Sequence, residues 1–189
     1  MLTSIAFVTG ILSGVALLTL SLAGLLISGF RFWPPPDRGS WQYKTFWTLF
    51  RFFIVGLIIL CVAEFHRNGS PSLAMSVTGW ALFALGFGLA TLISGRLGWG
   101  NAHGEAVDLK TEGWFGVSRN PIYVASVLGM VGLAIAINST LVSVLLFLWA
   151  LMYVLAPFTE EPWLLQQYGS AYKEYCKRVP RFIGRVRDV

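Results

Sequence analysis

The stretch PIYVASVLGMVGLAIAINSTLVSVLLFLWALMYVLAPF, residues 121–158, carries no Lys, Arg, Asp or Glu. It lies inside an uncharged run, residues 120–159, that is about twice as long as the roughly 20 apolar residues that one membrane-spanning helix needs. Asn138 and Ser139 interrupt the run near its middle, and such a polar pair favours a turn. The stretch therefore predicts two spanning helices joined in a tight hairpin.

Three further segments predict spanning helices. Residues 1–30 and 68–95 are uncharged, and residues 45–63 carry only Arg51, close enough to one end for its guanidinium to reach the interface. The 189 residues are 56% hydrophobic and 12% charged, with a mean hydropathy of +0.67, which is too apolar for one soluble core. We predict an all-α, polytopic membrane helical bundle in a single domain, residues 1–189, with transmembrane helices at residues 3–30, 45–63, 73–95, 121–137 and 141–158.

The distribution of Lys and Arg predicts the orientation of these spans, because basic residues near span ends resist translocation. With the N-terminus outside, Arg67 is the one basic residue of the outer segments. The inner segments then hold Arg31, Arg38, Lys44, Arg96, Lys110, Arg119, Lys173, Lys177, Arg178, Arg181, Arg185 and Arg187. We predict an integral membrane protein with a cytoplasmic C-terminus, in the inner (plasma) membrane if the source is prokaryotic. The first span should be retained, because no basic residue precedes it as in a signal peptide.

Two of the predicted cytoplasmic segments differ from plain connectors. Residues 96–120 are long for so small a membrane protein and rich in glycine, which lets a backbone approach a ligand closely. We predict a cofactor loop there, and the alternative is a flexible connector. Residues 33–47 combine three consecutive prolines with Trp33, Trp41, Tyr43 and Trp47, which suit the headgroup level of a bilayer. We assign this second segment an anchoring role and no chemistry.

The predicted hairpin brings two distant parts of the chain to the same side of the membrane. Small residues at helical spacing predict close packing and a rigid hairpin; they are Ala125, Gly129, Gly132 and Ala136. The tail, residues 159–189, should begin with an amphipathic helix capped by Thr159 that lies along the interface or covers a site there. Its apolar face consists of Leu164, Leu165, Tyr168, Tyr172 and Tyr175.

Polar residues gather at both ends of this hairpin. The residues before it include Gly113, Trp114, Phe115, Arg119, Asn120, Pro121 and Tyr123, and Glu160 and Glu161 follow it. An arginine pairs with a carboxylate, and carboxylates accept hydrogen bonds from hydroxyl and amino groups. The two clusters therefore predict a site for a zwitterionic ligand that carries a ribose. The alternative is a structural ion pair between Arg119 and one of the glutamates.

The order and spacing of these residues resemble the integral membrane methyltransferases that include isoprenylcysteine carboxyl methyltransferase and phosphatidylethanolamine N-methyltransferase. The resemblance covers less than half of the chain and rests on Gly113, Arg119-Asn120-Pro121-Ile122-Tyr123, Glu160-Glu161, Leu164, Tyr168-Gly169, Tyr172, Tyr175 and Val179-Pro180-Arg181-Phe182. It implies that S-adenosylmethionine binds in a cytoplasm-facing pocket between the loop before the hairpin and the tail after it. It also implies methyl transfer to a lipid-like substrate.

The resemblance suggests roles for single residues, and the sequence departs from the family's usual residues at two positions. Glu160 and Glu161 are expected to hold the cofactor, and Arg178 or Arg181 is a candidate for holding an anionic group of the substrate. Asn120 stands where the family usually has histidine, and Ala125 where glycine is common. Because asparagine does not titrate near neutrality, this position supplies no general base.

Two other functions stay open: a membrane reductase that uses NADPH on a lipid-like substrate, and a non-catalytic membrane subunit. The first is suggested by the similar C-terminal fold of sterol reductases. We predict no metal site, because His66 and His103 have no further His or Cys at ligand spacing. We predict two inert thiols, Cys61 and Cys176, and no nucleic-acid partner.

Overall fold

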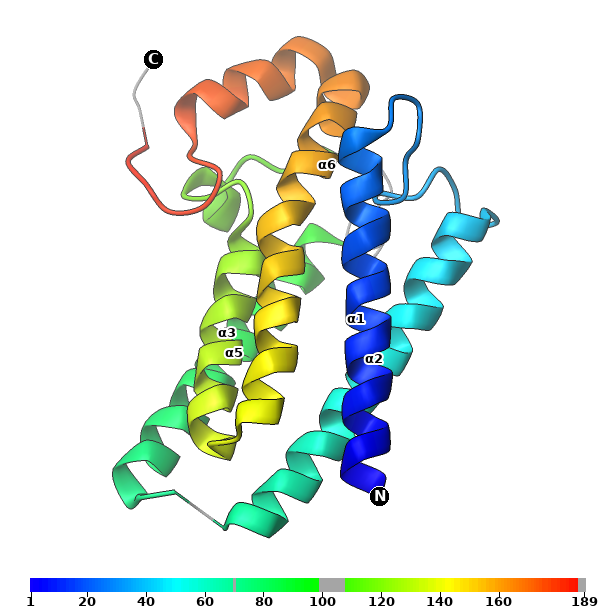
Figure 1. Ribbon diagram of the computed structural model, residues 1–189. Coiled ribbons are helices and arrows are strands. Elements are labelled where there is room, and N and C mark those ends of the chain that lie inside the picture. Colours follow the sequence, from blue (N-terminus) through cyan, green and yellow to red (C-terminus); the bar gives the residue numbers. More distant parts are fainter. Residues whose placement is uncertain (70, 99–107, 187–189) are drawn as a thin grey trace.

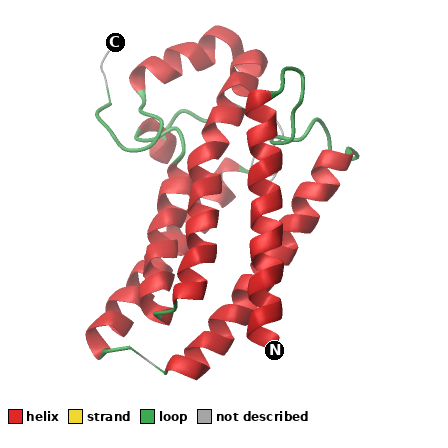
Figure 2. Ribbon diagram, in the orientation of Figure 1, coloured by secondary structure: helices red, strands yellow, loops and turns green. Residues whose placement is uncertain are grey.

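A computed structural model describes residues 1–69, 71–98 and 108–186 of the chain. Its elements are α1 (Leu2–Leu26), α2 (Trp41–Asn68), α3 (Leu73–Leu97), the short 3-10 helix η1 (Gly113–Gly116), α5 (Pro121–Ile137) and α6 (Thr140–Arg178), drawn in Figure 1. Every regular element in this described part is helical (Figure 2). The prediction of an all-α helical bundle is therefore confirmed.

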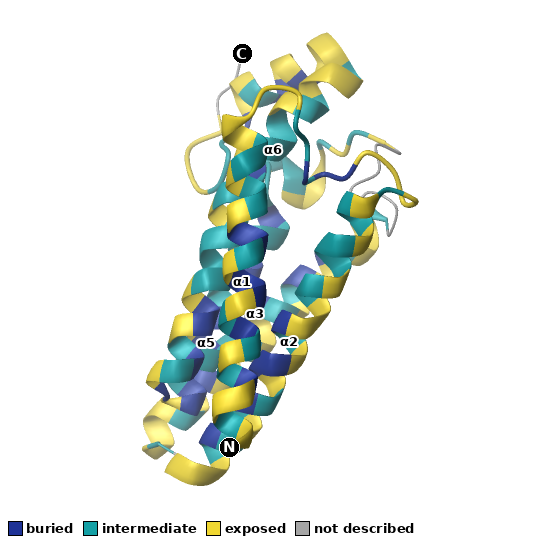
Figure 3. Ribbon diagram, turned by 45° about the vertical axis from the view of Figure 1, so that its right-hand side comes forward, coloured by how far each residue is buried: buried dark blue, intermediate teal, exposed yellow. Residues whose placement is uncertain are grey.

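Four helices, α1, α2, α3 and α6, are long and apolar enough to cross a membrane. The remaining apolar helix, α5, has 17 residues, which at 1.5 Å per residue gives about 26 Å, slightly less than the ~30 Å thickness of a hydrocarbon core. Figure 3 shows exposed residues along the outer faces of the bundle, and many of them are large and apolar, such as Leu12, Val77 and Phe147. The protein is an integral membrane protein whose outer faces suit lipid.

Helix α6 corrects one predicted boundary. A break was expected at residue 158, with a new helix capped by Thr159, but α6 continues to Arg178 and the Thr159 hydroxyl donates to the Ala156 carbonyl inside it, at 2.8 Å. Neither Thr nor Glu interrupts a helix by itself, so the change from apolar to polar composition does not end α6. The backbone leaves helical geometry at Gly169, where φ is 54°, a value that favours glycine.

The helices alternate in direction and so separate the loops into two groups (Figure 1). The N-terminus, the α2–α3 connection and the α5–α6 turn lie at one end of the bundle. The α1–α2 loop, residues 108–120 and the chain after Gly169 lie at the other end. The hairpin of α5 and α6 thus places the residues before Pro121 near those after Phe158, and this second end contains the candidate site.

The small residues of α5 pack closely, but their partner is α3 and not the other arm of the hairpin. A methyl group added to Gly86 would lie 2.6 Å from the Cα of Gly129, and one added to Gly79 would lie 2.6 Å from the nitrogen of Ala136. Such distances leave no space for a side chain, so the α3 and α5 backbones are in direct contact. Close packing was predicted correctly, but its assignment to the hairpin was wrong because α3 supplies the matching glycines.

A buried glutamate joins the helices at the end far from the candidate site. Glu64 of α2 is buried, and its Oε2 accepts a hydrogen bond from the Ser139 hydroxyl at 2.7 Å and one from the Arg67 guanidinium at 2.8 Å. Ser139 lies in the α5–α6 turn, which begins with Asn138 in the left-handed conformation. A buried carboxylate needs such donors, so this contact fixes α2 against the hairpin.

Candidate functional site

The segment before α5 is held by the chain that follows α6. We call residues 179–186 the C-terminal strap. The backbone nitrogen of Arg119 donates to the carbonyl of Pro180 at 2.9 Å, and the Asn120 side-chain amide donates to the carbonyl of Arg181 at 2.8 Å. The Ser118 hydroxyl donates to the same Arg181 carbonyl at 3.4 Å. The segment that carries the family-like motif and the strap are therefore joined side by side, and Asn120 serves to join them.

An ion cluster, formed by Arg119, Glu161 and Arg181, strengthens this junction. Arg181 donates to both oxygens of Glu161, at 2.8 and 2.7 Å, while Nη1 of Arg119 lies 3.2 Å from Oε1. The Arg119, Glu161 and Arg181 side chains are 12%, 16% and 34% exposed. Hydrogen bonding to Glu161 raises the pKa of Arg181 above its usual value, so this guanidinium stays charged. The ion pair between Arg119 and a glutamate, left open by the sequence, is present.

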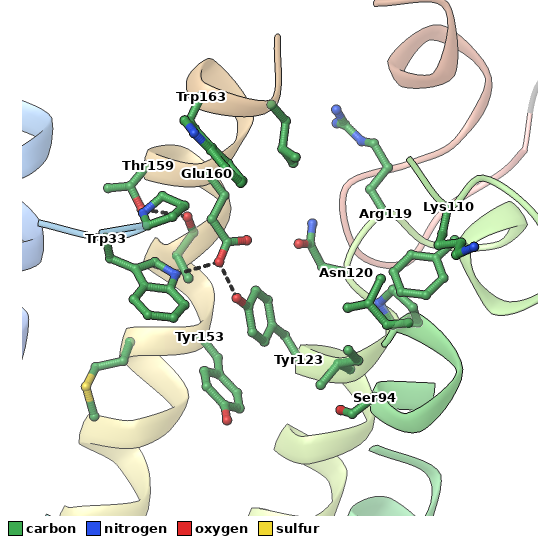
Figure 4. Close-up of a pocket in the computed structure, with 18 of the residues that line it drawn as sticks. Trp33, Ser94, Lys110, Arg119, Asn120, Tyr123, Tyr153, Thr159, Glu160 and Trp163 are labelled. Carbon is green, nitrogen blue, oxygen red and sulfur yellow. Dashed lines mark hydrogen bonds between the residues drawn. The ribbon is translucent and has the colours of Figure 1, made fainter. Parts of the chain in front are cut away.

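A cavity of about 300 Å³ lies between the α1–α2 loop, α2, α5, α6 and the segment before α5. Glu160 faces it from α6: its Oε1 accepts one hydrogen bond from the Trp33 indole at 2.6 Å and another from the Tyr123 hydroxyl at 2.5 Å (Figure 4). The other oxygen of Glu160 accepts no hydrogen bond from the described residues. Two donors on one oxygen thus orient the carboxylate, and the second oxygen is left for a ligand.

Arg119 faces Glu160 across the cavity, with Asn120 and Lys110 on the same side (Figure 4). Besides Glu161, its guanidinium donates to the Cys176 thiol, and its Nε is buried without a hydrogen-bond partner among the described residues. A buried, unpartnered donor on a cation is costly and suits an anionic ligand group. The cavity therefore carries a carboxylate on one side and a guanidinium on the other.

A family model described as phospholipid methyltransferase matches residues 74–171 of the chain. The chain belongs to this family. The match covers α3, η1, α5 and most of α6, so it includes both Arg119 and Glu160 and confirms the resemblance stated from the sequence. Helices α1 and α2 and the strap lie outside it.

Two curated proteins are similar to part of this chain. The nickel-cobalt-cadmium resistance protein NccN of Alcaligenes xylosoxydans xylosoxydans is 34% identical over 98 residues, which are 51% of this chain and 42% of the relative. The cobalt-zinc-cadmium resistance protein CzcN of Cupriavidus metallidurans is 35% identical over 79 residues, 41% of this chain and 36% of the relative. The aligned part therefore spans less than half the length of either relative. No solved structure matches the chain.

The structure places most, but not all, of the predicted site residues at this cavity. The lining residues among them are Phe115, Arg119, Asn120, Pro121, Tyr123 and Glu160. Gly113 and Trp114 instead line a second, open hollow with Arg96, which adjoins the cavity through Lys110 and Phe115. Glu161 and Arg181 belong to the ion cluster, and Arg178 is exposed at the end of α6. The roles given to these last residues stay predictions.

The amphipathic part of α6 covers the cavity. Leu164, Tyr168, Tyr172 and Tyr175 line it, and the Tyr175 hydroxyl donates to the Phe115 carbonyl at 2.6 Å. Leu165 of the predicted apolar face is exposed instead. Among the described residues, no group of three or more His, Cys, Asp or Glu could hold a metal ion. Gly100, His103 and Gly104 of the predicted cofactor loop lie outside the described residues.

Sequence reasoning missed the part of the cavity formed by the α1–α2 loop. Residues 33–47 were assigned an anchoring role without chemistry, but Trp33 donates to Glu160 and stacks on Phe46, with ring centroids 4.1 Å apart. Both line the cavity, as does Trp47, whereas the exposed Trp41 does not. The correction concerns a contact between residues 127 positions apart, for which the local sequence carries no signal.

Proposed function

We propose that this protein transfers a methyl group from S-adenosylmethionine to a lipid-like substrate, at the end of the bundle that the basic residues predict to be cytoplasmic. The observation that carries the proposal is the pair of opposed charges in the cavity, Glu160 with one unpartnered oxygen and Arg119 with a buried, unpartnered Nε. The family match supports the reaction class.

The residues present fit this cofactor. It is a zwitterion with an added sulfonium charge, so Glu160 would hold its cationic part or a ribose hydroxyl and Arg119 would hold its carboxylate. The cavity of about 300 Å³ lies at the lower end of the range for small-molecule sites. Once bound, the cofactor supplies an activated methyl group, so the reaction needs little acid or base from the protein.

The chain's own contribution is therefore orientation and the exclusion of water. Trp33 and Tyr123 fix the Glu160 carboxylate, and the tyrosines of α6 cover the cavity. The side-chain amide of Asn120 donates to the strap. This residue therefore supports the wall of the pocket and does not take a proton from the substrate. The substrate that accepts the methyl group must therefore enter the cavity with its nucleophilic atom already deprotonated or otherwise carrying a free lone pair.

The substitution Glu160→Gln tests this proposal. It removes the charge and one hydrogen-bond acceptor but keeps the shape, so the affinity for S-adenosylmethionine should fall about ten- to hundredfold, as expected for a charge-assisted hydrogen bond of ~1.5–3 kcal/mol. Isothermal calorimetry on the purified protein in detergent measures this. Glu174→Gln is the matched control, because Glu174 lies on the same helix, is 56% exposed and pairs with Lys177.

The same calorimetry with NADPH tests the reductase alternative, and lipid extracts with a radiolabelled methyl donor test transfer. Binding of the methyl donor together with a labelled lipid product is the expected result. Equal affinities of Glu160→Gln and wild type would remove Glu160 from the site. Binding of neither cofactor would favour a non-catalytic membrane subunit.

A further inference from the structure

The two donors that hold the Glu160 carboxylate come from different parts of the chain. Tyr123 belongs to α5, inside the segment that the family model matches, whereas Trp33 belongs to the α1–α2 loop, before residue 74, where the match begins. Both donate to the same oxygen, Oε1, the indole at 2.6 Å and the hydroxyl at 2.5 Å. The matched segment therefore supplies one donor, and the N-terminal part of this chain supplies the second.

The α1–α2 loop holds the Trp33 indole by packing that does not involve Glu160. The residues on either side of Trp33, Phe32 and Pro34, are fully buried. Proline fixes its own φ and restricts the backbone of the residue before it. The indole ring stacks on Phe46 of α2, with ring centroids 4.1 Å apart. The indole N–H thus has a fixed support, and Glu160 of α6 meets it there.

A second donor matters because glutamate is a long, flexible side chain, and ordering such a chain costs free energy. Tyr123 alone would give the carboxyl group one point of attachment, about which it can still turn. Trp33 adds a second point on the same oxygen, so the other oxygen faces the side of the cavity where Arg119 and Asn120 lie (Figure 4). The carboxylate is then ordered before a ligand arrives, and binding does not bear that cost.

We propose that Trp33 is a positioning residue of the cofactor site, and that the α1–α2 loop, which the family match leaves out, completes that site. This inference rests on the proposed function, because Trp33 acts on S-adenosylmethionine only through Glu160. Its loss should weaken cofactor binding about threefold to tenfold, as expected when one flexible side chain must be ordered on binding. That is less than the effect expected for the loss of the Glu160 charge itself.

The substitution Trp33→Phe removes the N–H and keeps an aromatic ring. In calorimetry on the purified full chain in detergent, its affinity for S-adenosylmethionine should fall about threefold to tenfold, and thermal unfolding of the same sample shows that it is folded. Trp41→Phe is the matched control, because Trp41 begins α2 beside the same loop, is 53% exposed and does not line the cavity. The affinity of this control should equal that of wild type.

Nuclear magnetic resonance of labelled tryptophan gives a readout that needs no cofactor. Among the eight tryptophans, one indole N–H signal should disappear in Trp33→Phe. The same signal should move upfield in Glu160→Gln, because a hydrogen bond to a neutral amide is weaker than one to a carboxylate. Glu174→Gln, which changes an exposed pair with Lys177, should leave it in place. A role of Trp33 in packing alone would not make its indole signal respond to the charge at residue 160.

Titration of the wild type with S-adenosylmethionine should move the same indole signal, with the affinity that calorimetry gives. This titration still decides if Trp33→Phe fails to fold, because Glu160→Gln then identifies the signal. Equal affinities of the Trp33 and Trp41 variants, or an indole signal that ignores both Glu160→Gln and the bound cofactor, would overturn the proposal. Absence of any cofactor binding by the wild type would refute the proposed function as well, so the two failures are distinguishable.

Discussion

Replacing Glu161 by glutamine separates the ion cluster from the cofactor site. The substitution removes the negative charge that faces both Arg119 and Arg181, while the side chain keeps its size. Hydrogen bonds to a charged partner contribute about 1.5–3 kcal/mol each. Because Arg181 is 34% exposed and solvent screens part of its interaction, we expect the lower part of that range, about 1.5–2 kcal/mol.

This loss weakens the attachment of the strap, which is otherwise held by three hydrogen bonds to residues 118–120, by the contact of Arg181 with the Phe158 ring and by the buried Val179. A loss of 1.5–2 kcal/mol raises the population of released strap about ten- to thirtyfold. Limited trypsin digestion in detergent reports that population, since cleavage after Arg181 needs the strap backbone free of its hydrogen bonds to residues 118–120. We expect cleavage after Arg181 to accelerate by the same factor, with the rest of the bundle intact.

Glu174→Gln is again the control, because it breaks an exposed pair with Lys177 on the same helix and should change cleavage after Arg181 by less than about twofold. The affinity for S-adenosylmethionine should fall less in Glu161→Gln than in Glu160→Gln. If Glu161→Gln is cut at the wild-type rate but binds the cofactor as weakly as Glu160→Gln, then Glu161 is a cofactor ligand and its assignment to the strap is wrong.

Two more predictions concern packing and topology. Gly129→Leu should lower the thermal unfolding midpoint in a differential scan, because a methyl group at Gly129 would already lie 2.5 Å from the Phe87 ring and overpacking costs about 1–3 kcal/mol. Gly88→Leu is the control and should not lower the midpoint, because nothing lies within 4 Å of that position. A reporter fused after Val189 should be cytoplasmic, and one inserted between Asn138 and Thr140 should be external. A cytoplasmic signal from the second site would contradict the hairpin.

The arrangement of the spans was predictable because it depends on composition. A run of uncharged residues is read directly from the sequence, and the polar pair Asn138-Ser139 marks the turn between α5 and α6 where the structure has it. The continuation of α6 beyond residue 158 was less predictable, because polar residues are compatible with a helix, and the backbone leaves helical geometry only at Gly169, where φ is positive.

The candidate site was predictable where its residues are close in the chain to the hairpin, as Arg119, Asn120, Tyr123 and Glu160 are. The contribution of Trp33 was not, because a tryptophan beside prolines suits a membrane interface equally well and its partner is far away in the sequence. The partner of the α5 glycines was missed for a related reason. Small residues show that a helix packs closely, but not against which neighbour.

The glutamate pair shows most clearly why neighbouring residues need not share a role. Successive residues of an α-helix point about 100° apart, so a helix that borders a cavity turns Glu160 into it and Glu161 toward the strap. Glu161 is shared between the two guanidinium groups around it, and the Glu160 carboxyl lies across the cavity from Arg119 (Figure 4). With S-adenosylmethionine bound as we propose, its cationic part would therefore lie beside Glu160 and its carboxylate beside Arg119.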